Sequence, residues 1–203
     1  MLESIGDILI SIDHNIWYFL NVLWHNEVLD AIIPYFRNQW TWTPLYLFLA
    51  VFMPMNFGRK GVMWCVFFIL TFAISDHISA SMLKPLFHRL RPCNDPHLSK
   101  MVHLLVPCGS GLSFPSSHAA NHFALAVFSG ITLRSRIKWI WPVAMFWAVS
   151  VAYAQVYVGV HFPLDVTAGA VVGSLAGILT GKVYNRVYNL AKVPLTLTDE
   201  QSA

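Results

Sequence analysis

Charged residues are scarce in this chain of 203 residues. Only 11% of the sequence is Asp, Glu, Lys or Arg, whereas 56% is hydrophobic, and between residues 41 and 198 the carboxylates are Asp76, Asp95 and Asp165. Soluble domains carry about 25% charged residues, so the shortage excludes an ordinary soluble domain. The small net charge of +3 gives no reason to expect a nucleic-acid partner. We expect residues 1–203 to form one integral membrane domain, in which a carboxylate is either paired or functional.

Cysteine is also scarce. The chain has Cys65, Cys93 and Cys108 and no Cys-x-x-Cys pair, which leaves a zinc ribbon or a redox motif unsupported. A compact metal-ligand set such as His-Glu-x-x-His is missing too, so we expect no metal and no cofactor. Cys65 lies in an apolar run and is expected to pack there. Cys93 and Cys108 flank one polar loop, and the sequence leaves open whether they form a disulfide or stay free thiols.

The sequence contains several long apolar runs. Because a transmembrane helix needs about 20 mostly apolar residues, they predict an all-α integral membrane bundle of about five or six transmembrane helices. The expected core is 41–183, with runs at 41–55, 61–83, 118–133, 139–158 and 164–183. Residues 1–40 mix apolar and polar positions at helical spacing, which predicts an amphipathic segment at the membrane interface, with a sixth crossing left open.

The loops between these runs set an orientation. Cations gather at Arg59, Lys60 and 134–138, and again in the tail 184–203. The positive-inside rule places them in the cytoplasm. We therefore expect a protein of the bacterial inner membrane, whose opposite face opens to the periplasm or exterior.

Glycine recurs every four residues in the last run, at Gly169, Gly173 and Gly177. Small residues at this spacing share one helix face and allow a second helix to approach closely. We expect this face to pack within the chain rather than at a dimer interface.

Three polar stretches lie beside apolar runs: Lys84–Pro92, Phe114–His118 and Gln155–Asp165. In the first, Lys84 and Arg91 are fixed cations in a loop stiffened by prolines, as a phosphate site requires. In the second, Pro-Ser-Ser-His precedes an apolar helical run. There the Ser116 hydroxyl and the N–H groups of Ser117 and His118 can point at an anion on a helix N-terminus.

The third stretch places His161 four residues before Asp165. A carboxylate at that spacing can accept a hydrogen bond from one ring nitrogen and leave the other free to attack. His118 then remains to protonate a leaving oxygen, which suits a group that titrates near neutrality.

These residues resemble the motifs of the type 2 phosphatidic acid phosphatase family of membrane lipid phosphatases, over about residues 76–175. Lys84, Arg91 and Pro92 complete the first motif, Lys, six residues, Arg-Pro. The second, Pro-Ser-Gly-His, appears at 115–118 with Ser117 in the glycine place. The third, Ser-Arg, five residues, His, three residues, Asp, appears as Ala154-Gln155 followed by His161 and Asp165. The resemblance implies His161 as nucleophile, Asp165 as its orienter, His118 as general acid, and Lys84 and Arg91 as phosphate ligands. Ser116 and Ser117 are expected to bind the phosphate from the helix N-terminus.

The chain departs from the third motif at Gln155, where the family usually has a phosphate-binding arginine. Glutamine still donates to a phosphate oxygen, but it exchanges a charged hydrogen bond of about 1.5–3 kcal/mol for a neutral one of about 0.5–1.5 kcal/mol. We expect Gln155 to bind phosphate more weakly, and Gln155→Arg to keep or raise activity.

The resemblance implies a metal-independent lipid phosphatase that forms a phosphohistidine. A bacterial membrane protein with an outward-facing site favours undecaprenyl diphosphate as the lipid partner. Phosphatidylglycerol phosphate, phosphatidic acid, diacylglycerol diphosphate and the phosphates of lipid A stay open. Two other classes compete: a metal hydrolase or transporter, and a non-catalytic anion-binding protein silenced by the missing arginine.

Some polar residues near the motifs receive secondary roles. We expect Arg89 to be an additional phosphate contact, and Asp76 with His77 to shape the site or balance Lys84. His122, one turn after His118, is a candidate support for it, whereas His88, His97 and His103 are expected to have no part in the chemistry.

Overall fold

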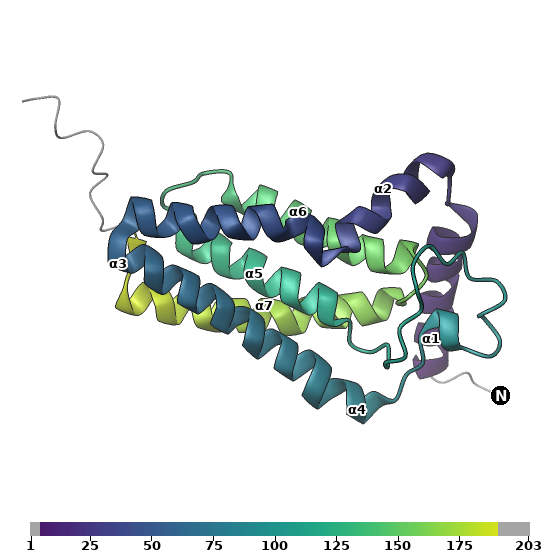
Figure 1. The fold of residues 1–203 in the computed structure, drawn as a ribbon. Coiled ribbons are helices and arrows are strands. Elements are labelled where there is room, and N and C mark those ends of the chain that lie inside the picture. Colours follow the sequence, from purple (N-terminus) through teal and green to yellow (C-terminus); the bar gives the residue numbers. More distant parts are fainter. Residues whose placement is uncertain (1–4, 191–203) are drawn as a thin grey trace, which may run out of the picture.

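The computed structural model describes residues 5–190, and in that part every regular element is helical (Figure 1). The prediction of an all-α fold is therefore confirmed. The elements are α1 (Ile5–Trp17), continued by Tyr18–Leu23; α2 (Glu27–Arg37) and the turn Gln39–Trp42; α3 (Thr43–Asp76), continued by His77–Leu83; α4 (Lys84–Phe87) and the turn Pro92–Asn94; α5 (Ser117–Leu133); α6 (Ile140–Tyr157); and α7 (Pro163–Val187).

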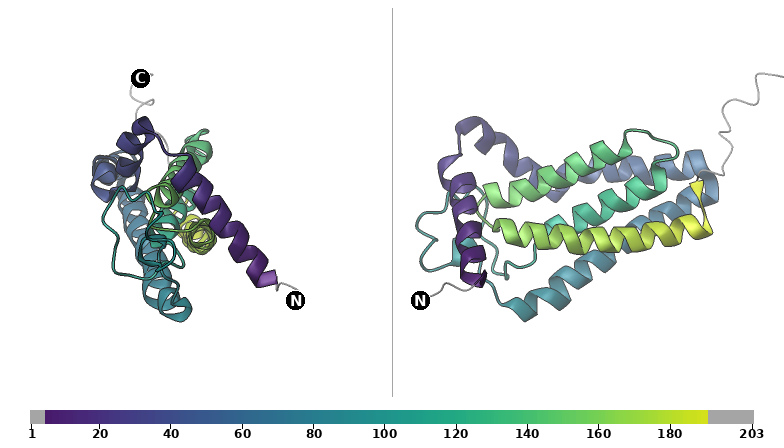
Figure 2. Two further views of the ribbon diagram at one scale, coloured as in Figure 1. Left: turned by 90° about the vertical axis from the view of Figure 1, so that its right-hand side faces the viewer. Right: turned by 180° about the vertical axis from the view of Figure 1, so that it is seen from behind.

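Helix α3 folds back on itself at Gly58. That glycine has φ +52°, outside the helical region, and so divides α3 into two arms that pack together near the bend and diverge away from it (Figures 1 and 2). A Cβ added to Gly61 would lie 1.8 Å from the Met53 carbonyl oxygen, so the arms touch through backbone. The predicted runs 41–55 and 61–83 are these two arms, with the cationic Arg59 and Lys60 at the bend.

Helix α5 is the centre of the bundle. Most of its residues are buried, and it packs against α7, α6 and α3. A Cβ added to Gly173 would lie 1.9 Å from the Ala120 carbonyl oxygen, and one added to Gly169 would lie 2.4 Å from that of Ser116. The glycine face of α7 therefore packs within the chain, as predicted. This close approach brings the N-termini of α5 and α7 together at one end of the bundle.

The N-terminal segment covers that same end. Helix α1 runs across the ends of the bundle helices instead of along them, and the long connection 88–116 lies beside it (Figure 2). Helix α2 packs on α6. Its side chains Leu29 and Ile33 contact the apolar cluster of Tyr157, Val158 and Val160.

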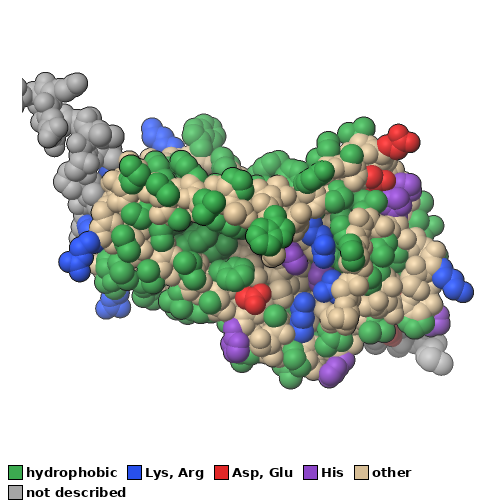
Figure 3. Space-filling model, in the orientation of Figure 1, with side chains coloured by type: hydrophobic (Ala, Val, Ile, Leu, Met, Phe, Trp, Pro, Cys, Tyr) green, Lys and Arg blue, Asp and Glu red, His purple; other side chains and the backbone are tan. Residues whose placement is uncertain are grey.

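The outer surface of the bundle is hydrophobic (Figure 3). Segments long and apolar enough to cross a membrane are Gln39–Asn94, which includes both arms of α3, Ile140–Tyr157 and Pro163–Val187. In the described part of the chain these are three helices, of which the first bends into the two arms of α3, and α5 packs among them at the centre of the bundle. The C-terminal helix continues to Val187, past the expected end at 183, and residues 191–203 of the expected tail lie outside the described residues.

Candidate active site

Backbone hydrogen bonds join the three motifs at the end of the bundle crossed by α1. The Ser113 N–H donates to the Arg89 carbonyl at 2.7 Å, which links the second motif's loop to the first. The Ser116 N–H donates to the Asp165 carbonyl at 2.9 Å, which links the second motif to the third. Segments up to 76 residues apart are thus held in one place, as the prediction of a single site requires.

His161 and Asp165 form a buried pair. Nδ1 of His161 lies 3.4 Å from Oδ2 of Asp165, and both side chains are almost fully buried. The same carboxylate oxygen accepts the backbone N–H of Phe162 at 2.8 Å, which caps the first turn of α7. Ser113 Oγ donates to Oδ2 and lies 3.4 Å from His161 Nδ1. Because Nδ1 faces the carboxylate, Nε2 is the ring nitrogen left for chemistry.

Arg89 holds Asp165 from the other side. Its Nη1 donates to Asp165 Oδ1 at 2.8 Å, its Nη2 donates to Asp13, and its guanidinium lies 4.1 Å above the Phe162 ring centroid. Asp13 also accepts the backbone N–H of Leu164 at 2.7 Å. Arg89 is therefore engaged with two carboxylates, which differs from the expected additional phosphate contact.

Asp13 comes from α1 and was missed by the sequence analysis. It lies in an amphipathic segment, where an acidic residue is expected to face solvent. In the structure its side chain is buried, at 2% exposure. Ser113 was also missed, since it precedes the second motif by two residues. Asp13 lies outside the range 41–198 in which carboxylates are scarce, so its sequence context gave no signal for its role.

The electrostatics keep His161 neutral. Burial lowers its pKa to about 4; the hydrogen bond and charge of Asp165 oppose this shift, and the positive charges of Arg91 and Lys84 add to it. At pH 7 the ring is therefore uncharged, which is the form that can attack phosphorus.

Lys84 and Arg91 are cations without a carboxylate partner among residues 5–190. Nε of Arg91 donates to the Gly111 carbonyl at 3.0 Å, which orients the guanidinium. Figure 3 shows Lys, Arg and His side chains gathered in one hollow of the surface, beside the hydrophobic bundle. Uncompensated positive charge in such a hollow favours an anionic ligand.

The second motif forms the N-terminus of α5. Ser116 is its N-cap and its Oγ accepts the Ala119 N–H at 3.4 Å, so this hydroxyl serves the helix as a cap. Ser117 Oγ is buried without a hydrogen-bond partner in the described part of the chain. His118 lines a cavity of about 400 Å³ next to the site. Its ring lies within electrostatic range of His161 and Lys84.

Gln155, the residue in the arginine place, is fully buried at the end of α6. Its Oε1 accepts a hydrogen bond from Arg37 Nε at 3.2 Å. Arg37 is the last residue of α2 and was not considered in the sequence analysis, because nothing in its local pattern marks it.

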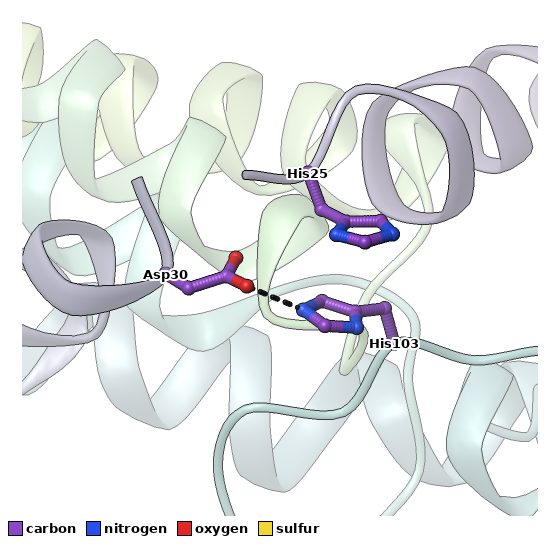
Figure 4. A group of neighbouring side chains, drawn as sticks. All are labelled: His25, Asp30 and His103. Atoms are coloured by element: carbon purple, nitrogen blue, oxygen red, sulfur yellow. Dashed lines mark hydrogen bonds and ion pairs between the residues drawn. The ribbon is translucent and has the colours of Figure 1, made fainter. Parts of the chain in front are cut away.

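A second polar cluster brings His25 and Asp30 of the N-terminal segment beside His103 of the connection 88–116 (Figure 4). His103 Nε2 lies 2.9 Å from Asp30 Oδ2, and the His25 and His103 rings stack at 4.1 Å. Asp30 also accepts the Tyr157 hydroxyl at 2.7 Å, so the cluster ties α2 to α6 and to the long connection. Within residues 5–190 it is the one group of side chains placed to hold a metal ion, and it is separate from His161 and Asp165.

Other secondary candidates contact neighbours of the site. His122 Nδ1 lies 2.8 Å from the His118 carbonyl oxygen, so it contacts the backbone of His118. Asp76 accepts the Asn121 amide at 2.9 Å and acts electrostatically on Lys84.

Comparison with known proteins gives consistent matches. The family model described as "PAP2 superfamily" matches residues 61–188. A lipid A 4'-phosphatase of Bacteroides thetaiotaomicron is 33% identical over 84% of this chain and 74% of its own length. An undecaprenyl-diphosphatase of Sulfolobus acidocaldarius is 30% identical over 70% of this chain and 62% of its own length. The crystal structure of Aquifex aeolicus LpxE superimposes with a TM-score of 0.67 at 29% identity, over 84% of this chain and 95% of that one.

Proposed function

This chain belongs to the PAP2 superfamily of phosphatases, and from that premise we propose that it removes a terminal phosphate from a membrane lipid through a phosphohistidine at His161, without a metal ion. The observation that carries the proposal is the buried His161–Asp165 pair at 3.4 Å, set beside the unpaired cations Lys84 and Arg91. That arrangement provides a neutral nucleophile and a positively charged place for the phosphate.

Two displacements complete the reaction. In the first, His161 Nε2 attacks phosphorus, the bond from phosphorus to the lipid oxygen breaks, and His118 gives its proton to that oxygen. In the second, His118 takes a proton from water, whose oxygen attacks the phosphohistidine and releases phosphate and neutral His161. Lys84, Arg91 and the N–H groups at the start of α5 stabilise the charge on the equatorial oxygens.

For the substrate, we place a phosphorylated glycolipid of the lipid A class first. Two observations support it: the 33% identity to a lipid A 4'-phosphatase, and the cavity at His118, whose lining includes the aromatic and amide side chains of Tyr35, Asn38, Gln39 and Trp40. Such side chains suit a sugar as the leaving group. Undecaprenyl diphosphate, favoured by the sequence analysis, is the second candidate because an undecaprenyl-diphosphatase matches 70% of the chain.

For location, we propose the bacterial inner membrane, with the site facing the periplasm. The hydrophobic bundle supports a membrane location. The cations Arg59, Lys60 and Arg134 at the end opposite the site support the orientation.

The deciding experiment measures phosphate release by detergent-purified protein with EDTA present. Lipid A, undecaprenyl diphosphate, phosphatidylglycerol phosphate and phosphatidic acid are compared, with His161→Ala beside the wild type. We expect release from lipid A that survives EDTA and disappears in His161→Ala. Quenching with labelled substrate should trap an acid-labile phosphoryl group on the wild type only. Activity that remains near normal in His161→Ala, or that EDTA abolishes, would contradict the mechanism.

A further inference from the structure

Gln155 holds an arginine instead of facing the cavity as a donor. Its side chain is fully buried, its Oε1 accepts Nε of Arg37, and its Nε2 has no hydrogen-bond partner among the described residues. A buried amide with one group unpaired costs free energy, so its presence at this position calls for a role. The contact itself indicates that role, which is to fix the direction of the Arg37 guanidinium.

Arg37 is placed by the packing of α2. The helix is fixed on α6 by Leu29 and Ile33, and Asp30 accepts the hydroxyl of Tyr157 at 2.7 Å. Its last turn therefore ends at the same place as the C-terminal turn of α6, which carries Gln155. Arg37 thus contacts Gln155, which lies 118 residues later in the chain.

The charge of Arg37 is not neutralised by the protein. Within residues 5–190 no carboxylate forms an ion pair with it, and Nε is the one nitrogen that donates to a protein group. Burial and the nearby charge of Arg91 both lower the pKa of Arg37, yet a guanidinium stays protonated in proteins. Its two terminal nitrogens thus remain available beside another unpaired cation.

Arg37 also shares the cavity of the proposed general acid. The cavity of about 400 Å³ is lined by Arg37 and His118, and the charge of Arg37 acts on the His118 ring. An anion that reaches His118 therefore meets Arg37 as well.

We propose that Arg37 is the third cation of the phosphate site and that Gln155 is the residue that positions it. The guanidinium donates from Nη1 and Nη2 to a phosphate oxygen, while Nε is held by Gln155. In this chain the positive charge that the third motif usually provides at position 155 is supplied by α2. The inference rests on the proposed function, because the anion it binds is the phosphate that His161 attacks.

The test measures inhibition by orthovanadate and kcat/KM for the lipid phosphate that the wild type hydrolyses, with EDTA present. Loss of a charged hydrogen bond predicts that Arg37→Ala weakens orthovanadate binding about 10- to 100-fold. Arg59→Ala, at the opposite end of the bundle, is the matched control and should leave the inhibition constant unchanged.

An exchange of the two residues separates anion binding from a merely structural role. The double variant Arg37→Gln with Gln155→Arg should recover most of the lost orthovanadate affinity, because one guanidinium again faces the cavity. Arg37→Lys should keep part of the orthovanadate affinity. If size exclusion and thermal unfolding show that Arg37→Ala fails to fold, Arg37→Lys serves as the test variant. Orthovanadate inhibition of folded Arg37→Ala within twofold of the wild type would overturn the inference.

Failure of the proposed function has a different signature. A wild-type protein that hydrolyses none of the lipids contradicts the phosphatase proposal. Calorimetric titration with inorganic phosphate then still decides the role of Arg37, since weaker binding by Arg37→Ala than by Arg59→Ala supports it and equal binding overturns it.

Discussion

Arg89 donates to Asp165 at 2.8 Å, so a cation from the first motif's loop holds the carboxylate that faces His161. Its other terminal nitrogen donates to Asp13 of α1. The guanidinium is thus shared by two buried carboxylates and joins the N-terminal helix to the site. Arg89 and Arg91, two residues apart, consequently have different tasks: Arg89 is paired with protein carboxylates and Arg91 is not.

Replacement of Arg89 should lower the stability of the folded protein more than replacement of Arg91. Arg89→Met leaves two buried carboxylates without a cation, and removal of one partner of a buried pair costs about 3–5 kcal/mol. Arg91→Met is the matched control: it should weaken orthovanadate binding with little change in thermal unfolding. Equal losses of stability in the two variants would contradict the division. Thermal unfolding in detergent and the inhibition constant are the measurements.

Ser113 should assist the pair of His161 and Asp165. Its hydroxyl donates to Asp165 and lies 3.4 Å from His161 Nδ1. Loss of a hydrogen bond to a carboxylate, worth about 1.5–3 kcal/mol, predicts that Ser113→Ala lowers kcat about 10- to 100-fold. Ser110→Ala, at an exposed position of the same connection, should leave kcat unchanged. An unaltered kcat in Ser113→Ala would show that the contact has no effect on catalysis.

The phosphatase activity should persist at acidic pH. A free histidine titrates near pH 6.5, whereas burial lowers the pKa of His161 to about 4, so the nucleophile stays neutral down to that range. The acid limb set by His161 should therefore lie near pH 4, which kcat/KM against pH and 15N NMR of the histidine rings would measure. Because the folded-state pKa is the lower one, the stability from neutral His161 is present above pH 6.5 and is lost as pH falls from 6.5 towards 4. A His161 titration at pH 6.5 would contradict the burial argument.

A substitution that separates α5 from α7 should lower the stability of the fold and also disturb the site. A Cβ at Gly173 would lie 1.9 Å from the Ala120 carbonyl oxygen, so Gly173→Ala forces the helices apart, and overpacking of this kind costs about 1–3 kcal/mol. The shift also strains the bond from the Ser116 N–H to the Asp165 carbonyl. Gly111→Ala, whose Cβ would meet nothing closer than 4.0 Å, serves as the stability control. Thermal unfolding of both variants decides the matter, and equal values would contradict close packing.

The connection that carries Arg91 and Gly111 is closed by a disulfide between Cys93 and Cys108, one of the two alternatives that the sequence left open. A loop of this length predicts a loss of about 3 kcal/mol when the bond is removed. Cys93→Ser should lower the thermal unfolding temperature, and alkylation under non-reducing conditions should label Cys65 alone. Labelling of all three thiols would contradict the bond.

The local pattern of the chain was enough to predict the helices, the membrane character and one shared site for the three motifs. The spacing of His161 and Asp165 predicted that the two side chains meet: His161 lies two residues before α7 and Asp165 lies in its first turn, with 3.4 Å between the ring and the carboxylate. The scarcity of charge predicted a membrane bundle, and the glycines of α7 predicted close packing, since each of these depends on composition or on residues adjacent along a helix.

The partners from the N-terminal segment could not be predicted in this way. Asp13 and Arg37 stand in segments whose local pattern is merely amphipathic, and each meets the site through contacts more than 70 residues away in the chain. The residue spacing within a helix does not predict contacts between residues so far apart in the chain.

The sequence by itself determined which chemical groups are present and which of them share a helical turn, because those relationships follow from backbone geometry. Only the tertiary structure decided that Arg89 holds Asp165, that Asp13 joins it, and that Arg37 meets Gln155. Those meetings depend on how α1 and α2 pack over the end of the bundle. The physical reason is that burial of apolar surface and pairing of buried charge select one arrangement of segments that are remote in the chain.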